Sequence, residues 1–281
     1  MRLIVAFLFF FLAPYLTQHA SAEPKRALPV DPSELTNAPS ADSTNAAAVP
    51  AEPAPPPLPL AVPNGINIHW YGHGFVFITS SVGVRAAIDP FGPNLVHYKF
   101  PDHLTADFVL ISHESEDHAS ADQIFGNPLI FRSVTAVGLN RANGTEFHGT
   151  SLTRDPGGSG GANTAFTLKF DGITMGFLGQ ISVPLTDTEK EQFGTVDVLF
   201  LPVGLQTLSV TQLNQVASDT GARVIIPINY KTDRSGDLPL RTLDEYLDGS
   251  KLPVRRFDTE EIALTRDALP NTPTIYVLKS P

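Results

Sequence analysis

The chain has 281 residues, of which 42% are hydrophobic, and this share supports a substantial core and excludes a protein that is disordered throughout. Its formal net charge is −10, which argues against nucleic acid or an anionic membrane surface as a partner. It contains no cysteine, so disulfide bonds and thiolate metal ligands are excluded, and any metal must be held by imidazole nitrogen and by oxygen.

Residues 1–22 have the pattern of a secretory signal peptide. Arg2 precedes an apolar run from Leu3 to Leu12, and the small residues Ala20, Ser21 and Ala22 follow. The run is shorter than the roughly 20 residues that a bilayer span needs, so we expect cleavage after Ala22 and no stable membrane span afterwards. The mature protein is therefore expected to be exported, to the periplasm or the extracellular space.

Residues 23–63 are rich in proline and alanine and contain 11 of the 25 prolines of the chain. Such a segment buries too little apolar surface to offset the entropy of ordering it, so we predict a disordered, extended linker. A proline-rich ligand for a partner domain is the alternative interpretation. The folded domain is predicted to cover residues 64–281.

From residue 64 onward, short β-rich runs alternate with turns, and Asp171-Gly172 between two alternating runs is a strong hairpin signal. The runs predicted as strands are Ile66–Trp70, Phe75–Thr79, Val84–Ile88, Phe108–Ser112, Thr145–Leu152, Ala165–Phe170, Thr174–Leu178, Val196–Pro202 and Val224–Pro227.

Helices are fewer. The clearest begins after Ser209, which can form a capping box with Gln212, and Gly221 can end it. Residues 240–247 form a second helical candidate. Many strands with interspersed helices indicate an α/β sandwich in which two sheets pack face to face and helices cover the outside.

The segment His113-Glu114-Ser115-Glu116-Asp117-His118 directly follows a predicted buried strand. It matches a zinc-binding H-x-H-x-D-H signature in which serine replaces the second histidine. A strand that delivers such a loop at its C-terminal end is typical of a metal site, whereas two isolated histidines in a loop are commonly just hydrogen-bonded residues.

With these motifs, the domain resembles the metallo-β-lactamase fold superfamily, and within it the group that includes ascorbate-6-phosphate lactonase and other metal-dependent hydrolases. The motifs that carry the resemblance, in order, are Ile68–Phe75 with its Gly-His turn, Ala87–Pro90, Ile111–His118, Asn163–Phe166 with Asp171-Gly172, Phe177–Gln180, Val196–Gly204 and Ile226–Thr232. The resemblance implies a four-layer αββα sandwich.

In active members of that superfamily, one metal is bound by the first two histidines of the loop and a third from a later strand. The second metal is bound by the loop aspartate, the last loop histidine and a fourth histidine, and an aspartate bridges both metals. By position, this chain retains His113, Asp117 and His118, whereas the other four of the seven ligands are replaced by Ser115, Arg154, Gln180 and Asn229.

These replacements predict a depleted metal site. Two-metal hydrolysis needs cations about 3.5–4 Å apart, with an anionic bridge that offsets their repulsion, and Gln180 is neutral. No cofactor is therefore expected, or one weakly bound zinc or manganese ion near Asp117 and His118. Arg154, if it points inward, would place a positive charge beside Asp117 in place of the metals.

Several other residues carry weaker signals. His73 can line the pocket or serve only the turn, and Asp89 beside Pro90 is interpreted as structural. His148 could supply a missing imidazole if its strand shifted register. Ser159 formally fits a G-x-S-x-G nucleophile motif, but a glycine-rich loop is the simpler interpretation.

The sequence leads to two hypotheses about the function. The first is an exported, catalytically degenerate member of the fold that acts as a binding or scaffold module, with an unknown small molecule or protein as partner and a vestigial Asp117. The alternative is an active hydrolase with a single metal, acting on a lactone, an ester or a phosphodiester.

Overall fold

The computed structural model describes residues 63–153 and 161–281. The predicted signal peptide, nearly all of the predicted linker, Arg154 and Ser159 lie outside the described residues. Within the described part, no helix combines the length and the hydrophobicity that a membrane span requires.

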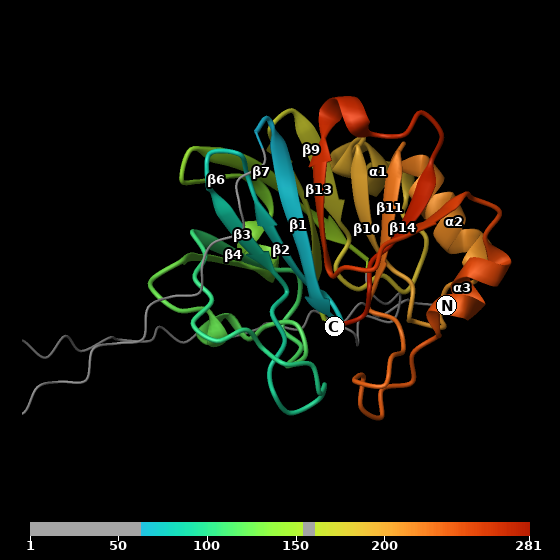
Figure 1. Ribbon diagram of the computed structural model, residues 1–281, viewed down its shortest axis with the longest axis horizontal. Helices are drawn as coiled ribbons and strands as arrows, with labels where there is room; N and C mark the ends of the chain where they lie inside the picture. Colours follow the sequence, from blue (N-terminus) through green and yellow to red (C-terminus); the bar gives the residue numbers. More distant parts are fainter. Residues whose placement is uncertain (1–62, 154–160) are drawn as a thin grey trace, which may run out of the picture. The chain divides into compact units, whose positions relative to one another are not determined.

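Two β-sheets form the centre of the fold (Figure 1). The first has the order β13-β1-β2-β3-β4-β5 and consists of β1 (Gly65–Gly72), β2 (Phe75–Thr79), β3 (Arg85–Ile88), β4 (Phe108–Ile111), β5 (Leu129–Arg132) and β13 (Glu261–Thr265). The second has the order β12-β14-β11-β10-β9-β8-β7-β6 and consists of β6 (Gly138–Ala142), β7 (Thr145–Leu152), β8 (Asn163–Phe170), β9 (Ile173–Phe177), β10 (Val198–Pro202), β11 (Val224–Ile228), β12 (Val254–Arg256) and β14 (Thr274–Val277).

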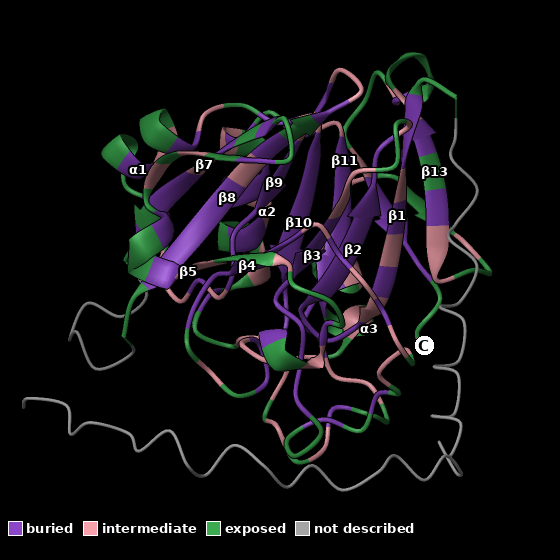
Figure 2. Ribbon diagram, turned by 90° about the vertical axis from the view of Figure 1, so that its left-hand side faces the viewer, coloured by how far each residue is buried: buried purple, intermediate pink, exposed green. Residues whose placement is uncertain are grey.

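The predicted α/β sandwich is confirmed, because side chains that alternate along the strands fill the space between the two sheets. On β2, Val76 and Ile78 point into this core, and on β4 Phe108 and Leu110 do the same. Phe108 stacks on Phe147 of the other sheet, with ring centroids 5.5 Å apart. Figure 2 shows both sets of inner strands as almost wholly buried.

Three short helices cover the second sheet: α1 (Asp187–Phe193), α2 (Val210–Asp219) and α3 (Leu243–Gly249). Each begins with a capping box, and in α2 it is the predicted pair of Ser209 and Gln212. The helix predicted at residues 240–247 begins instead at Leu243, since Thr242 provides its cap. Helix α1 was not predicted from the sequence.

The outer face of the first sheet has a different cover. Phe75 and Phe77 of β2 point away from the sandwich core and pack against Phe91, Val96 and Tyr98 of the loop after β3. The cover is completed by the short 3₁₀ helix at residues 121–123. Among the described residues, the outer face of the first sheet is therefore covered by loops and a 3₁₀ helix, whereas the outer face of the second sheet is covered by α-helices.

The predicted hairpin at Asp171-Gly172 joins β8 to β9. Both residues have positive φ angles, of 50° and 77°, as a type I′ turn requires. The Asp171 carboxylate also accepts a 2.8 Å hydrogen bond from the backbone N–H of Ser81, which ties the second sheet to the β2–β3 turn.

Candidate functional site

The strand ends of both sheets meet at one end of the sandwich. β3 and β4 run parallel, as do β9, β10 and β11, so their C-terminal ends share this edge. Two backbone hydrogen bonds of 2.8 Å join the sheets here, from Thr164 to Ser112 and from Asn229 to His73. The residues predicted to form a site follow these strands and are therefore brought together by topology.

His73 lies in the turn between β1 and β2 and is 1% exposed. Its φ angle of 49° is left-handed, and its carbonyl oxygen accepts hydrogen bonds from the Trp70 indole and from the Asn229 backbone. Its Nε2 lies 2.8 Å from Asp117 Oδ2. Burial lowers the pKa of His73 to about 4, so the ring is neutral at pH 7 and Nε2–H donates to the carboxylate.

Asp117 is the acceptor at the centre of the cluster. Its second oxygen accepts from the Ser115 hydroxyl and lies 3.1 Å from His118 Nδ1. Burial raises the pKa of this carboxyl, but the contacts with His118 and His73 outweigh burial and hold that pKa far below its usual range. The carboxylate is therefore charged at every physiological pH.

His118 and Asn229 close the other side of the cluster. Asn229 follows β11, is 1% exposed, and places its amide nitrogen 3.4 Å from His118 Nε2. The ring of His118 packs against Gly74, where an added Cβ would lie 2.7 Å from it. Asn229 Oδ1 is buried and has no hydrogen-bond partner among the described residues.

The backbone at Asn229 lies closely against Gly204, which follows β10. A Cβ on Gly204 would lie 1.9 Å from the Asn229 carbonyl oxygen. We expect Gly204→Ala to lower the free energy of unfolding by about 2–3 kcal/mol, because this clash is with backbone and cannot be relieved by a side-chain rotation. Denaturant titration measures the loss.

Gly83→Ala is the matched control for Gly204→Ala. Gly83 has a φ angle of +86° but open space around its Cβ position. The Gly83→Ala variant should therefore lower the free energy of unfolding only by the strain of the left-handed conformation, about 1 kcal/mol. An equal loss in both variants would contradict the proposed clash at Asn229.

His113 lies beside this cluster. Its ring centroid is 4.4 Å from that of His118, and its Nδ1 lies 2.8 Å from the Ser112 hydroxyl. That hydroxyl donates to Asp89, which also accepts a 2.7 Å bond from the Ser112 backbone. Asp89 thus braces the start of the loop, as its structural interpretation implies.

The buried position of Asp89 predicts a measurable pH effect. Burial raises its pKa to about 6, so between about pH 4 and pH 6 the folded state holds a proton that the unfolded state releases. The Asp89 contribution to stability therefore falls as the pH rises through this range. The free energy of unfolding of Asp89→Asn, relative to the parent chain, should increase by about 2–3 kcal/mol from pH 4 to pH 7.

Urea unfolding of both proteins at the two pH values measures this difference. Taking the difference between variant and parent removes the contribution of His73, whose lowered pKa acts with the opposite sign in this range. A pH-independent difference would show that Asp89 is ionised like an exposed carboxylate.

Two other residues that the sequence singled out, Gln180 and His148, lie at different places relative to the cluster. Gln180 follows β9, and its backbone N–H donates to Asn163 Oδ1 at 3.2 Å. Asn163 also donates to the Leu178 carbonyl, so this buried residue holds the turn that carries Gln180, a role that sequence reasoning missed. His148 lies on β7 beside Thr150, outside the cluster.

The donor set fits one cation. His73, Asp117 and His118 each offer a ligand atom, and these atoms lie within 4.8 Å of one another. Two imidazoles and a carboxylate are ligands that zinc and manganese accept, and three protein ligands are usual for a catalytic zinc. Nδ1 of His73 is buried without a hydrogen-bond partner among the described residues, whereas Nε2 is the ring nitrogen that faces Asp117. His73 was predicted from the sequence only as a pocket residue, and its place in the turn gave no sign of this role.

The same residues do not fit a pair of cations. Ser115 donates its hydroxyl to Asp117, and Asn229 brings a neutral amide beside His118. Gln180 is also neutral, so no anionic bridge stands among these residues. Among the described residues, the ligand atoms that converge at this strand edge are those of His73, Asp117 and His118.

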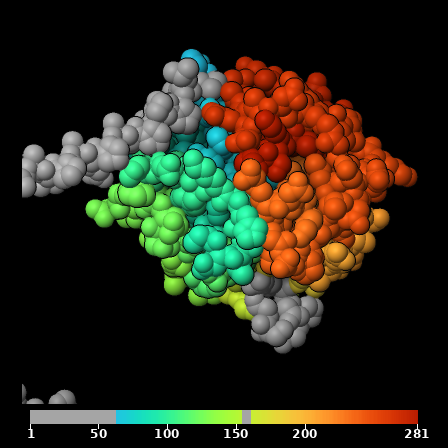
Figure 3. All heavy atoms as spheres, turned by 60° about the horizontal axis from the view of Figure 1, so that its bottom comes forward, coloured from blue at the N-terminus to red at the C-terminus, as the bar shows by residue number. Residues whose placement is uncertain are grey.

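The end of the sandwich over this cluster is closed by two loops. The loop after β3 and the loop after β11 meet through a 2.7 Å bond from the His97 N–H to the Arg234 carbonyl. Tyr98 adds a hydroxyl contact with Thr232 and packs its ring on Gly72. Figure 3 shows this face, with the teal-green and orange segments in direct contact.

Solved structures with a similar fold were found by comparison. A protein of the metallo-β-lactamase superfamily from Thermotoga maritima, named as a candidate Zn-dependent hydrolase, is 26% identical, with a TM-score of 0.62 over 77% of this chain and 100% of that one. Igni18, a metallo hydrolase from Ignicoccus hospitalis, is 18% identical, with a TM-score of 0.53 over 71% of this chain and 98% of that one. At 18% identity, the similarity to Igni18 shows the fold alone.

A search of curated proteins returned no match. A family model, described as the beta-lactamase superfamily domain, matches residues 67–229. This match runs from β1 to Asn229 and so contains every residue of the cluster. The fold, the order of the motifs and this match agree, and the chain belongs to the metallo-β-lactamase superfamily.

Proposed function

We propose that this protein is an exported, catalytically degenerate member of the superfamily that acts by binding or as a scaffold. The observation that carries the proposal is the state of Asp117, whose two oxygens contact His73, Ser115 and His118 in a buried network. A carboxylate that is engaged in this way is part of the folded core of the loop.

The neutral side chains at the cluster argue in the same direction. Two cations about 3.5–4 Å apart repel each other and need an anionic bridge to share an activated water. Ser115, Gln180 and Asn229 provide hydroxyl and amide groups instead. Water activation between two metals is therefore not the chemistry that these residues support.

A second candidate function is hydrolysis with a single metal, on a lactone, an ester or a phosphodiester. The specific observation in its favour is the convergence of His73, Asp117 and His118 within 4.8 Å. A bound cation would supply Lewis-acid polarisation of a carbonyl or phosphoryl oxygen. The chain's own residues would hold the cation, and Asn229 would keep the His118 ring in place.

Metal analysis with a hydrolysis screen separates the two functions. The purified mature protein is dialysed against zinc or manganese, its metal content is measured, and turnover of lactone, ester and phosphodiester substrates is followed with and without chelator. Our proposal expects no turnover above that of Asp117→Asn. Stoichiometric metal with chelator-sensitive turnover that Asp117→Asn abolishes would overturn the proposal and establish the second function.

Export is tested on the same expressed protein. N-terminal sequencing of material from the periplasm or the medium should begin at Glu23. Retention of Met1 or Arg2 on a cytoplasmic product would contradict the proposed export without affecting the proposal of catalytic degeneracy.

A further inference from the structure

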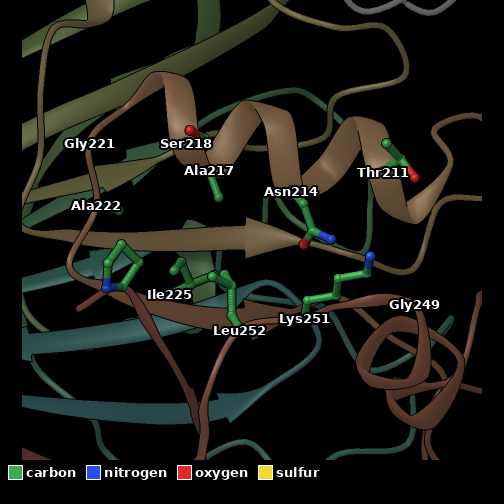
Figure 4. Close-up of a pocket in the computed structure, with 11 residues that line it drawn as sticks. Thr211, Asn214, Ala217, Ser218, Gly221, Ala222, Ile225, Gly249, Lys251 and Leu252 are labelled. Carbon is green, nitrogen blue, oxygen red and sulfur yellow. The ribbon is translucent and has the colours of Figure 1, made fainter.

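A cavity lies away from the histidine cluster and shares no residue with it. It is formed between α2, the strand β11 and the segment that follows α3, and its volume is about 460 Å³ (Figure 4). This volume lies within the range of small-molecule sites, which is roughly 300–1,000 Å³. The position is on the helix-covered side of the second sheet.

The walls of this cavity are mainly apolar. Ala217 of α2, Ala222 and Ile225 are each at most 2% exposed, and Leu252 and Pro273 complete the apolar lining. The cavity follows α2 from Thr211 to Ser218, and the seven helical steps between these residues correspond to roughly 10 Å at 1.5 Å per residue. The shape therefore suits one elongated apolar group of medium length.

Two polar groups stand together at one part of the cavity. Figure 4 shows Asn214 reaching from α2 into the cavity and the Lys251 ammonium pointing toward it from the opposite wall. Asn214 Oδ1 is buried and has no hydrogen-bond partner in the described part of the chain. Lys251 forms no ion pair with any described residue, although the chain carries a net charge of −10.

A cation without an ion pair among the described residues, together with an unsatisfied amide oxygen in a mainly apolar cavity, indicates which ligand fits. The Lys251 side chain is exposed, and its ammonium favours an anionic acceptor, whereas the buried amide oxygen of Asn214 needs an N–H or O–H donor. A carboxylate with a neighbouring hydroxyl provides both, and an alkyl tail fills the apolar part. A cationic head would be repelled by Lys251.

We propose that this cavity binds a medium-chain carboxylic acid, with its carboxylate on Lys251 and its tail along α2 over Ile225. A hydroxyl group beside the carboxylate strengthens binding by donating to Asn214 Oδ1. This binding does not involve the histidine cluster and is independent of whether the cluster holds a metal.

Calorimetric titration of the purified protein tests the proposal with four eight-carbon probes: octanoate, 3-hydroxyoctanoate, octanol and octylamine. We expect octanoate to bind at least about tenfold more tightly than octanol or octylamine, because a hydrogen bond to a charged group is worth about that factor. The 3-hydroxy acid should bind more tightly still. Octylamine or octanol binding as well as octanoate, or no binding by any probe, would overturn it.

Variants locate the binding. Lys251→Met keeps the length of the side chain without its charge and should weaken octanoate at least about tenfold, whereas Lys251→Arg should retain most of the affinity. Lys169→Met removes an exposed lysine on β8, outside the cavity, and is the matched control.

Ser218→Trp, at an exposed position of the cavity wall, should occlude the cavity and abolish binding without disturbing the core. Far-UV circular dichroism confirms that each variant is folded. Unchanged affinity in both Lys251→Met and Ser218→Trp would place the acid elsewhere and refute the assignment.

Discussion

The double variant Gln180→Asp/Asn229→His is expected to bind zinc at least about 100-fold more tightly than the parent chain. Loss of a single outer-shell partner of a metal commonly costs 10- to 100-fold in affinity, and this variant gains two direct ligands. Asn229 already lies 3.4 Å from His118 Nε2, so an imidazole there would point at the same space. Its φ angle of 54° is one that histidine tolerates better than most residues.

Competition with a chromophoric chelator measures the zinc affinity of the parent and the double variant. Adding Asp117→Asn to the double variant should remove the gain, because it neutralises the one anionic donor that the parent retains. An unchanged affinity in the double variant would mean that these strand ends no longer converge on a metal-sized space. An affinity gain that survives Asp117→Asn would place the new zinc elsewhere on the protein.

Asp117→Asn in the parent chain is expected to lower the free energy of unfolding by about 3 kcal/mol at pH 7, in the range for breaking a buried charged contact. The depressed pKa of Asp117 means that its carboxylate contributes stability above about pH 4, where the unfolded state is ionised, and loses it progressively below that. The difference between variant and parent should therefore shrink as the pH falls below about 4.

Guanidinium titrations at pH 7 and pH 3 measure this difference, and Asp122→Asn is the control. Asp122 is an exposed carboxylate in the 3₁₀ helix that follows this loop, so its substitution should change stability by less than about 0.5 kcal/mol. A stable Asp117→Asn at pH 7 would show that the contacts with His73, Ser115 and His118 do not hold the loop.

The strands of this protein were largely readable in the sequence. The predicted runs Phe75–Thr79 and Thr145–Leu152 coincide with β2 and β7, because alternating apolar residues there face a core on one side. The strands that sequence reasoning missed include β5, β6 and β12, which carry exposed side chains on sheet edges. Without a buried face, such segments show little hydrophobic alternation.

The candidate site was readable only in part. The spacing of residues in the loop from His113 to His118 indicates a metal-binding motif. Ser115, in place of the second histidine, shows that the motif is altered. His73 is a lone histidine after a glycine, and no local pattern distinguishes a turn residue from a residue that bonds Asp117. The contact between His73 and Asp117 joins positions 44 residues apart. It exists only because β1, β3 and β4 end at the same edge.

The sequence by itself therefore determined the two-sheet sandwich, which follows from short-range periodicity. The ordered motifs carried the resemblance to the superfamily, and that resemblance implied the replaced metal ligands at positions 115, 180 and 229. Only the tertiary structure decided that His73 joins Asp117 and His118, that Asp89 braces Ser112, and that Asn214 and Lys251 share a cavity. The physical reason is that hydrogen bonds and burial act between side chains at short range, and chain topology alone sets which distant residues come within that range.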